Sequence, residues 1–139
     1  MTEPASEDLW RPGKIISNYL FFLLPHFSVE IDYEPVGCFR DKRFNRALDK
    51  LVISFRGGQN LEGKTIWDYW EKDQMNHIIQ LCAEEAFRQG YTMVGLQHFG
   101  ECWSGEDAEK NYDRHGMSKN CINGVGKAST NYVYRIKGK

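Results

Sequence analysis

The pattern of hydrophobic and polar positions predicts several β-strands and one long amphipathic helix. The strand segments are rich in β-branched and aromatic residues, and they are residues 31–39, 50–55, 91–99 and 131–136. Pro35 cannot donate to a β-ladder, so it predicts a sheet edge or a strand entrance in the first segment. Gly57 and Gly58 end the second strand, and Gly95 allows another part of the chain to approach the third closely.

Residues 74–89 carry the strongest helical pattern in the chain. Apolar side chains recur at helical spacing on one face, namely Met75, Ile78, Ile79, Cys82 and Ala86. Asp73 is a suitable N-cap for this helix, and Gly90 is a suitable residue just beyond its C-terminus. The pattern therefore predicts a helix whose apolar face, including Cys82, points into the core.

A shorter helical turn is expected before this helix. Thr65 and Asp68 are suitable residues to start it, and the turn contains Trp67 and Trp70. Residues 40–49 are polar and predict a loop between the first two strands.

Two other parts of the chain show little regular pattern. Residues 1–14 predict a flexible arm, and residues 15–30 form an apolar lead-in that is either a short helix ending before Pro25 or a strand. Residues 100–131 are rich in Gly, Asn, Ser, Asp and Lys and contain few apolar residues. We therefore expect a long loop region there.

Together these elements predict an α+β fold with one main helix packed on a sheet and long C-terminal loops. The length of 139 residues is that of one domain. We divide the chain into an N-terminal arm and apolar lead-in, residues 1–30, and a single domain, residues 31–139. The apolar run at 19–27 is broken by proline and is too short to span a bilayer, so no membrane span is expected.

Charge and cysteine content narrow the class of protein. The net charge of −1 gives no general attraction to nucleic acid or to anionic membranes. The four cysteines lack CxxC spacing and are even in number; they are Cys38, Cys82, Cys102 and Cys121. This favours two disulfides and an oxidising, extracellular location, although no convincing signal peptide is present. The alternative is four free thiols in a reduced compartment.

Catalytic and metal-binding interpretations are weaker. Cys102 with His98 or His115 would form a nucleophilic pair only if the thiol were free. Acidic residues in the segment 106–113 offer oxygen ligands for calcium, but their spacing is not that of an EF-hand. We therefore expect no catalysis, no cofactor and no metal.

A binding surface is the favoured interpretation of the segment that follows Cys102. The candidate binding residues are Trp103, Ser104, Glu106, Tyr112 and Arg114. An exposed tryptophan beside polar groups in a loop can stack on a sugar ring, and the same residue types form protein-binding hot spots. The other interpretation of Trp103 is that it packs over a neighbouring disulfide.

Three stretches of the chain carry a resemblance to known modules. "VGCFRDKRFNRAL" at 36–48 and "GYTMVGLQHFGECWSG" at 90–105 resemble WSC and PAN/apple-like modules. With "CINGVGKASTNYVYRI" at 121–136, the chain is closer still to uncharacterised GECWSG-containing secreted modules of marine invertebrates. The resemblance covers residues 31–136, and the chain has fewer cysteines than WSC modules use.

The resemblance implies a twisted antiparallel sheet with one helix, and an extracellular recognition module without catalysis. Such lectin-like modules bind carbohydrate on glycoproteins or cell surfaces; a protein-binding or structural role in an extracellular matrix or in cell adhesion is the alternative. Four cysteines can be connected in three ways, and the favoured one combines Cys82–Cys102 with Cys38–Cys121. The expected partner is a glycan or an extracellular protein. Homo-oligomerisation through the N-terminal apolar segment is a further expectation.

Overall fold

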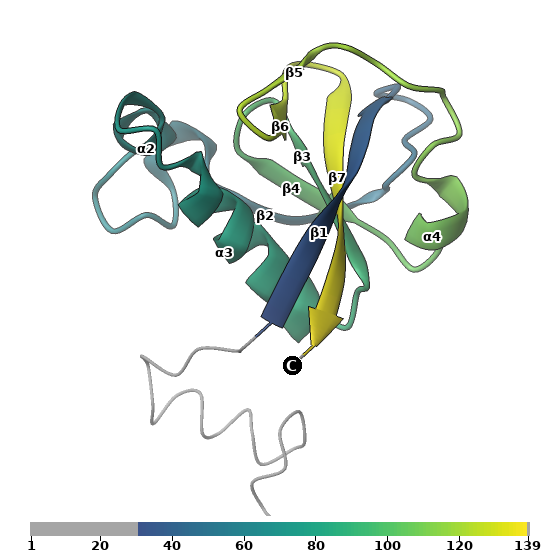
Figure 1. Cartoon of the computed structure of the whole chain (residues 1–139), viewed down its shortest axis with the longest axis horizontal. Helices are drawn as coiled ribbons and strands as arrows, with labels where there is room; N and C mark the ends of the chain where they lie inside the picture. The colour runs from purple at the N-terminus through teal and green to yellow at the C-terminus, as the bar shows by residue number, and fades with distance from the viewer. Residues whose placement is uncertain (1–30, 139) are drawn as a thin grey trace, which may run out of the picture.

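A computed structural model of the chain describes residues 31–138. The elements are β1 (Ile31–Arg40), β2 (Lys50–Ser54), the 3-10 helix η1 (Arg56–Gly58), α2 (Ile66–Glu71), α3 (Met75–Arg88), β3 (Met93–Gln97), β4 (Glu101–Ser104), α4 (Ala108–Asn111), β5 (Cys121–Ile122), β6 (Val125–Gly126) and β7 (Thr130–Gly138) (Figure 1). The expected α+β fold with one main helix on an antiparallel sheet is confirmed. The predicted N-terminal arm, the apolar lead-in and their role in oligomerisation lie outside the described residues.

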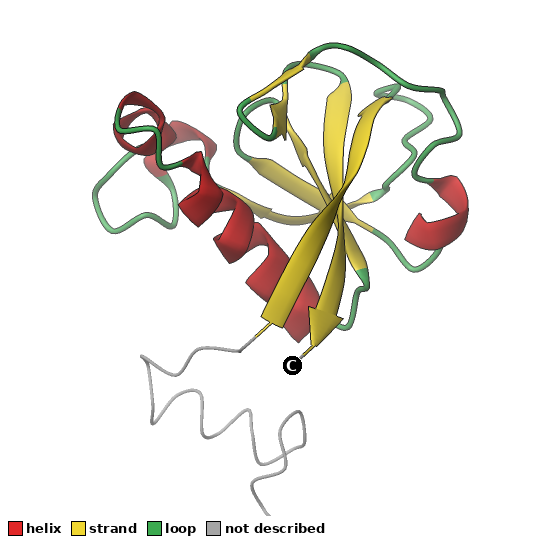
Figure 2. Ribbon diagram, viewed as in Figure 1, coloured by secondary structure: helices red, strands yellow, loops and turns green. Residues whose placement is uncertain are grey.

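The main sheet has five strands in the order β1-β7-β3-β4-β2, and every neighbouring pair is antiparallel. Strand β1 lies at one edge, so the prediction that Pro35 marks an edge strand is confirmed. The register of β1 against β7 shifts between Pro35 and Gly37, which forms a β-bulge at Val36. Figure 2 shows α3 and α4 on different sides of the sheet.

Helix α3 covers one face of the sheet with the apolar side predicted from the sequence. Its buried side chains pack in one cluster with residues of the two central strands, including Val94, Leu96 and Tyr134. Gly90 follows the helix at a φ of 93°, and its N–H donates to the Phe87 carbonyl over 2.9 Å, as expected for this position.

The predicted N-cap of α3 is wrong. Gln74 is the N-cap and makes no side-chain capping bond. Asp73 instead adopts a φ of 55°, and its N–H donates to the carbonyl of Trp70. Only three residues separate α2 from α3, so Asp73 lies in the turn that ends α2 and does not cap the start of α3.

Helix α2 begins as predicted. The Thr65 hydroxyl accepts a hydrogen bond from the Trp67 N–H at 3.2 Å, and the Asp68 carboxylate accepts one from the Thr65 N–H at 2.8 Å. This reciprocal capping box satisfies two donors that the helix cannot satisfy itself. The six-residue helix places Trp67 and Trp70 beside Phe99 of the β3–β4 turn.

The expectation of a long loop region over residues 100–131 holds only for residues 112–120, which contain no helix or strand. The rest of the segment contains β4, α4 and the small β5–β6 hairpin. Strand β4 has only four residues, two fully buried and two half-buried, so its alternating pattern is too short to be recognised in the sequence. The hairpin strands have two residues each, which is too short for an alternating pattern to be recognised.

A second, smaller core lies on the face opposite α3. All five residues of β3 are buried, and successive side chains of a strand point to opposite faces. This second cluster contains Phe39, Leu48, Met93, Ala108 and Val133. A Cβ at Gly95 would lie 2.7 Å from Leu48 Cδ1, so the close approach predicted at this glycine is confirmed.

Two disulfides connect the elements in the favoured pairing. Cys82–Cys102 joins α3 to β4, and Cys38–Cys121 joins β1 to the β5–β6 hairpin. The first lies within the main core, because both of its cysteines are fully buried. The second closes a sequence separation of 83 residues, a length at which cross-linking removes much entropy from the unfolded chain.

We expect the protein, denatured without reductant, to take up no thiol-alkylating label. After reduction it should take up four labels, measured as intact mass. Digestion without reduction should yield two linked peptides, one with Cys38 and Cys121 and one with Cys82 and Cys102. Labelling before reduction would contradict the disulfides shown here.

Candidate functional site

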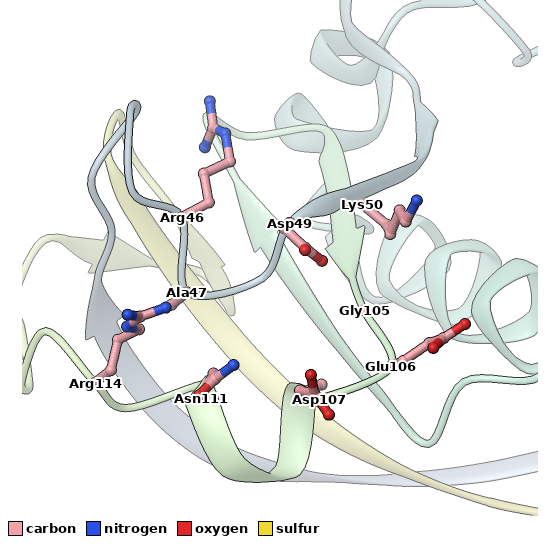
Figure 3. A pocket seen from close by; sticks show the side chains of 10 residues that line it. Arg46, Ala47, Asp49, Lys50, Gly105, Glu106, Asp107, Asn111 and Arg114 are labelled. Carbon is pink, nitrogen blue, oxygen red and sulfur yellow. The ribbon is translucent and has the colours of Figure 1, made fainter.

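Polar side chains gather on the sheet face opposite α3. The loop formed by residues 41–49 crosses this face, and the segment 105–114, which contains α4, borders it (Figure 3). Asp41, Gln97 and Asn131 are buried there beside the second cluster. Buried polar groups are costly unless they are hydrogen-bonded, so their partners show how this face is held together.

The carboxylate of Asp41 anchors the 41–49 loop to the sheet. Its Oδ1 accepts a hydrogen bond from the Ala47 N–H at 2.8 Å. Its Oδ2 accepts bonds from Arg46 Nη1 at 2.9 Å and from Gln97 Nε2 at 2.8 Å. Gln97 Nε2 also donates to Asn131 Oδ1 at 3.1 Å. One buried charge therefore joins the loop to two neighbouring strands.

Arg46 continues this network onto Trp103. The guanidinium carbon lies 4.0 Å from the centroid of the indole ring, a close cation–π contact. Trp103 Nε1 donates to Glu101 Oε1 at 3.1 Å, and the other oxygen of Glu101 lies 3.5 Å from Arg56 Nη1. The indole is thus fixed by a cation at its face and by an anion at its edge.

A polar pocket of about 250 Å³ opens between the 41–49 loop and the segment 105–114. Figure 3 shows its lining side chains, which are Arg46, Ala47, Asp49, Lys50, Gly105, Glu106, Asp107, Ala108, Asn111 and Arg114. Asp49, Asp107 and Asn111 border this space in Figure 3, whereas the Arg46 guanidinium extends away from it, toward Asp41 and Trp103. At Gly105 a Cβ would lie 2.6 Å from Asp49 Oδ1, so only glycine permits this carboxylate to approach the wall.

An ion pair holds α4 against the sheet. Glu109 receives two bonds from the Arg135 guanidinium of β7, the shorter at 2.9 Å, and one from the Thr92 hydroxyl. The hydrogen bonds from Arg135 lower the pKa of Glu109, and Glu109 in turn raises the pKa of Arg135. Tyr112 packs edge-to-face on Phe39, with 5.1 Å between ring centroids. These contacts fix the segment that carries the pocket wall.

The predicted binding residues fall into three environments. Glu106 and Arg114 line the polar pocket. Trp103 and Tyr112 are half-buried and pack against the second cluster. Ser104 is fully buried, and its hydroxyl donates to the Met93 carbonyl, so it ties β4 to β3 and has no surface to offer a ligand.

Trp103 lies in strand β4, and its expected placement in a loop is wrong. The alternative that it packs over a disulfide is also wrong. Neighbouring residues of a strand point to opposite faces, so Cys102 points toward α3, where it bonds to Cys82, while Trp103 points toward the second cluster.

The structure bears on three other interpretations of the sequence: a cysteine nucleophile, a metal site and a membrane span. Cys102 is in a disulfide, so it is not a free nucleophile for His98 or His115. Within residues 31–138, no three His, Cys, Asp or Glu side chains come together as a metal ion would require. The helices in this part of the chain are too short or too polar to cross a membrane.

Four polar pocket residues were missed by sequence reasoning, namely Arg46, Asp49, Lys50 and Asn111, and Asp107 was considered only as a calcium ligand. Arg46 and Asp49 belong to the polar 40–49 segment, which was interpreted only as a loop. Its density of charged residues was the available signal. Asn111 lies in α4, whose single turn gives no helical pattern.

Comparison with models of known protein families gave no match, and a search of curated protein sequences gave none either.

Replacing Asp41 by alanine should lower the free energy of unfolding by about 2–4 kcal/mol, because Arg46 and Gln97 would lose a buried anionic partner. Urea denaturation would measure the change. Asp113→Ala is the matched control, because this carboxylate is exposed, and its effect should stay within about 0.5 kcal/mol. Equal losses in the two variants would contradict the anchoring role of Asp41.

The Glu109–Arg135 pair should make stability pH-dependent in one direction. A lowered pKa in the folded state means that the stabilisation is present above the ordinary glutamate pKa of about 4.3 and is lost as the pH falls through the lowered value. Glu109→Gln should therefore reduce the urea midpoint at pH 7, and the difference from the parent should shrink toward pH 3. A difference that does not change with pH would contradict this assignment.

Proposed function

We propose that this chain is an extracellular recognition module that binds carbohydrate in the polar pocket and performs no catalysis. The observation that carries the proposal is the composition of the pocket. Its space of about 250 Å³ is below the roughly 300–1,000 Å³ of sites that hold drug-sized ligands, and it suits one sugar unit.

Sugar hydroxyls need both donors and acceptors around them. Carboxylates of Asp49, Glu106 and Asp107 accept hydrogen bonds, and carboxylates only accept when ionised. Lys50 and Arg114 only donate, whereas the Asn111 amide does both. A ring that carries several hydroxyls can use this mixture, whereas a purely apolar ligand would leave these groups without partners.

Trp103 supports the pocket rather than serving as the stacking platform expected from the sequence. Arg46 occupies a face of its indole ring at 4.0 Å, and the ring packs on the second cluster. The contact restrains the guanidinium and with it the loop that forms one wall of the pocket, so less conformational entropy is lost when a ligand binds. Trp103 therefore acts as a positioning residue for Arg46.

An extracellular location is supported by the two disulfides, which persist in oxidising compartments. The resemblance to WSC and PAN/apple-like modules implies the same location and a recognition role. The pocket residues Glu106 and Arg114 come from the segment after Cys102, which the pattern of polar and aromatic residues indicated as a binding surface.

A protein-binding role in an extracellular matrix is the second candidate, and a different surface favours it. Trp67 is 48 % exposed, and its ring lies 5.9 Å from that of Trp70 and 5.4 Å from that of Phe99. Partly exposed aromatic groups of this kind are frequent protein-binding hot spots. This group belongs to α2 and the β3–β4 turn, away from the residues that line the polar pocket.

A glycan array with the purified chain tests the carbohydrate proposal, followed by calorimetry on the best ligand. Asn111→Ala and Trp103→Ala should each weaken binding about tenfold or more. The first variant removes one or two hydrogen bonds to the bound sugar, and the second removes the side chain that positions Arg46 and the pocket wall. Lys137→Ala is the control, because this residue pairs with Glu34 on the β1–β7 edge.

Two outcomes would contradict the carbohydrate proposal. One is the absence of any glycan ligand. The other is a glycan whose affinity is unchanged by Asn111→Ala and Trp103→Ala but lost in Trp67→Ser, which would move recognition to the α2 surface.

A further inference from the structure

The loop that forms one wall of the polar pocket also carries a dense group of cations. Residues 40–46 contain Arg40, Lys42, Arg43 and Arg46, against one acid, Asp41. Asp41 is buried and already bound to Arg46. The chain is close to neutral as a whole, yet this loop presents a local excess of positive charge.

A second segment adds to this excess. The Arg40 N–H donates to the Gly116 carbonyl at 2.9 Å, and a ring nitrogen of His115 lies 2.6 Å from the Asn45 carbonyl oxygen. The segment that carries Arg114 therefore lies against the loop. We call the exposed side chains of Arg40, Lys42, Arg43 and Arg114 the basic ridge. None of the four forms a salt bridge with another described residue.

The ridge also presents an exposed aromatic side chain. Phe44 is 94 % exposed at the tip of the loop, which is the largest exposure of any large hydrophobic side chain described. The Arg43 guanidinium lies 5.6 Å from its ring centroid. A phenyl ring with this exposure contributes nothing to the core, and it is accessible to a ligand that binds the neighbouring cations.

We propose that the ligand is an anionic polysaccharide, sulfated or carboxylated, whose acidic groups bind the basic ridge while a sugar unit occupies the polar pocket. This inference rests on the proposed carbohydrate function and specifies its ligand class. Guanidinium groups bind sulfate and carboxylate through two parallel hydrogen bonds, which favours arginine at such surfaces.

The ridge is continuous with the pocket, because Arg114 belongs to both and Arg46 follows the loop tip into the pocket wall. The pocket itself holds Asp49, Glu106 and Asp107, which repel an anion but accept bonds from hydroxyls. A polysaccharide with acidic groups spaced along a hydroxyl-bearing chain satisfies both regions at once. An anionic membrane would use the ridge and Phe44 but would leave the pocket groups without partners.

The test compares binding of a heparin octasaccharide with its fully desulfated counterpart, by calorimetry at 50 and 200 mM salt. The sulfated probe should bind at least tenfold more tightly, and its affinity should fall roughly 10- to 50-fold over this salt range, as expected when about three charges are neutralised. Vesicles with 30 % phosphatidylserine should not bind.

The double variant Lys42→Ala/Arg43→Ala should lose about tenfold in affinity for the sulfated probe and most of the salt dependence. Lys64→Ala/Lys72→Ala is the matched control, since it removes two exposed cations near α2, and its affinity should stay within twofold of the parent. These four positions are exposed, and thermal unfolding would show that both variants remain folded.

Three outcomes overturn the anionic-ligand inference, and they separate it from the proposed function. If the desulfated probe binds equally well and Asn111→Ala abolishes both, the pocket binds sugar and the ridge has no part. If the vesicles bind through Lys42 and Arg43 while neither probe does, the ridge is a membrane surface. If no probe and no array glycan binds, the carbohydrate function fails as well.

Discussion

The buried carboxylate of Asp41 is the interaction on which the functional face depends. It binds the Ala47 backbone, the Arg46 guanidinium and the Gln97 amide, so the loop can adopt its course only when all three partners are in place. Loops are usually the least ordered parts of a domain. Here an ionised group bonded inside the fold fixes the loop on the sheet, and the directions of Arg46, Asp49 and the loop tip follow from it.

The sheet carries two cores with different chemistry because β3 is buried on both faces. On one face α3 packs through apolar side chains, and the Cys82–Cys102 disulfide fastens it. On the other face, Leu48 packs so closely on Gly95 that a larger residue there would displace the Leu48 side chain, and the loop brings its polar groups with it. The first face supplies most of the apolar burial, which leaves the second face able to accommodate the costly polar network.

The sequence predicted the parts of the fold that have a repeated pattern. Four of the five strands of the main sheet and α3 were found because each buries a stripe of apolar residues at a fixed spacing. Strand β4 was missed because four residues give too few repeats. Glu106 and Arg114 were found as polar neighbours of Trp103, but Arg46 and Asp49 were not, because the loop register that brings them together depends on Asp41 and on Gly105. Ser104 is polar but buried, which its neighbours in sequence do not reveal.

Charge is a further property that the sequence total describes less well than the local arrangement in the fold. A net charge of −1 describes the whole chain, whereas a bound anion interacts mainly with groups within the screening length of about 8 Å at physiological salt. The fold gathers Arg40, Lys42, Arg43 and Arg114 at one place and withdraws Asp41 into the interior, where its charge is satisfied by Arg46. The folded protein therefore has a positive surface that a sum over the sequence cancels, and the local arrangement, not the total, determines which ligands this surface attracts.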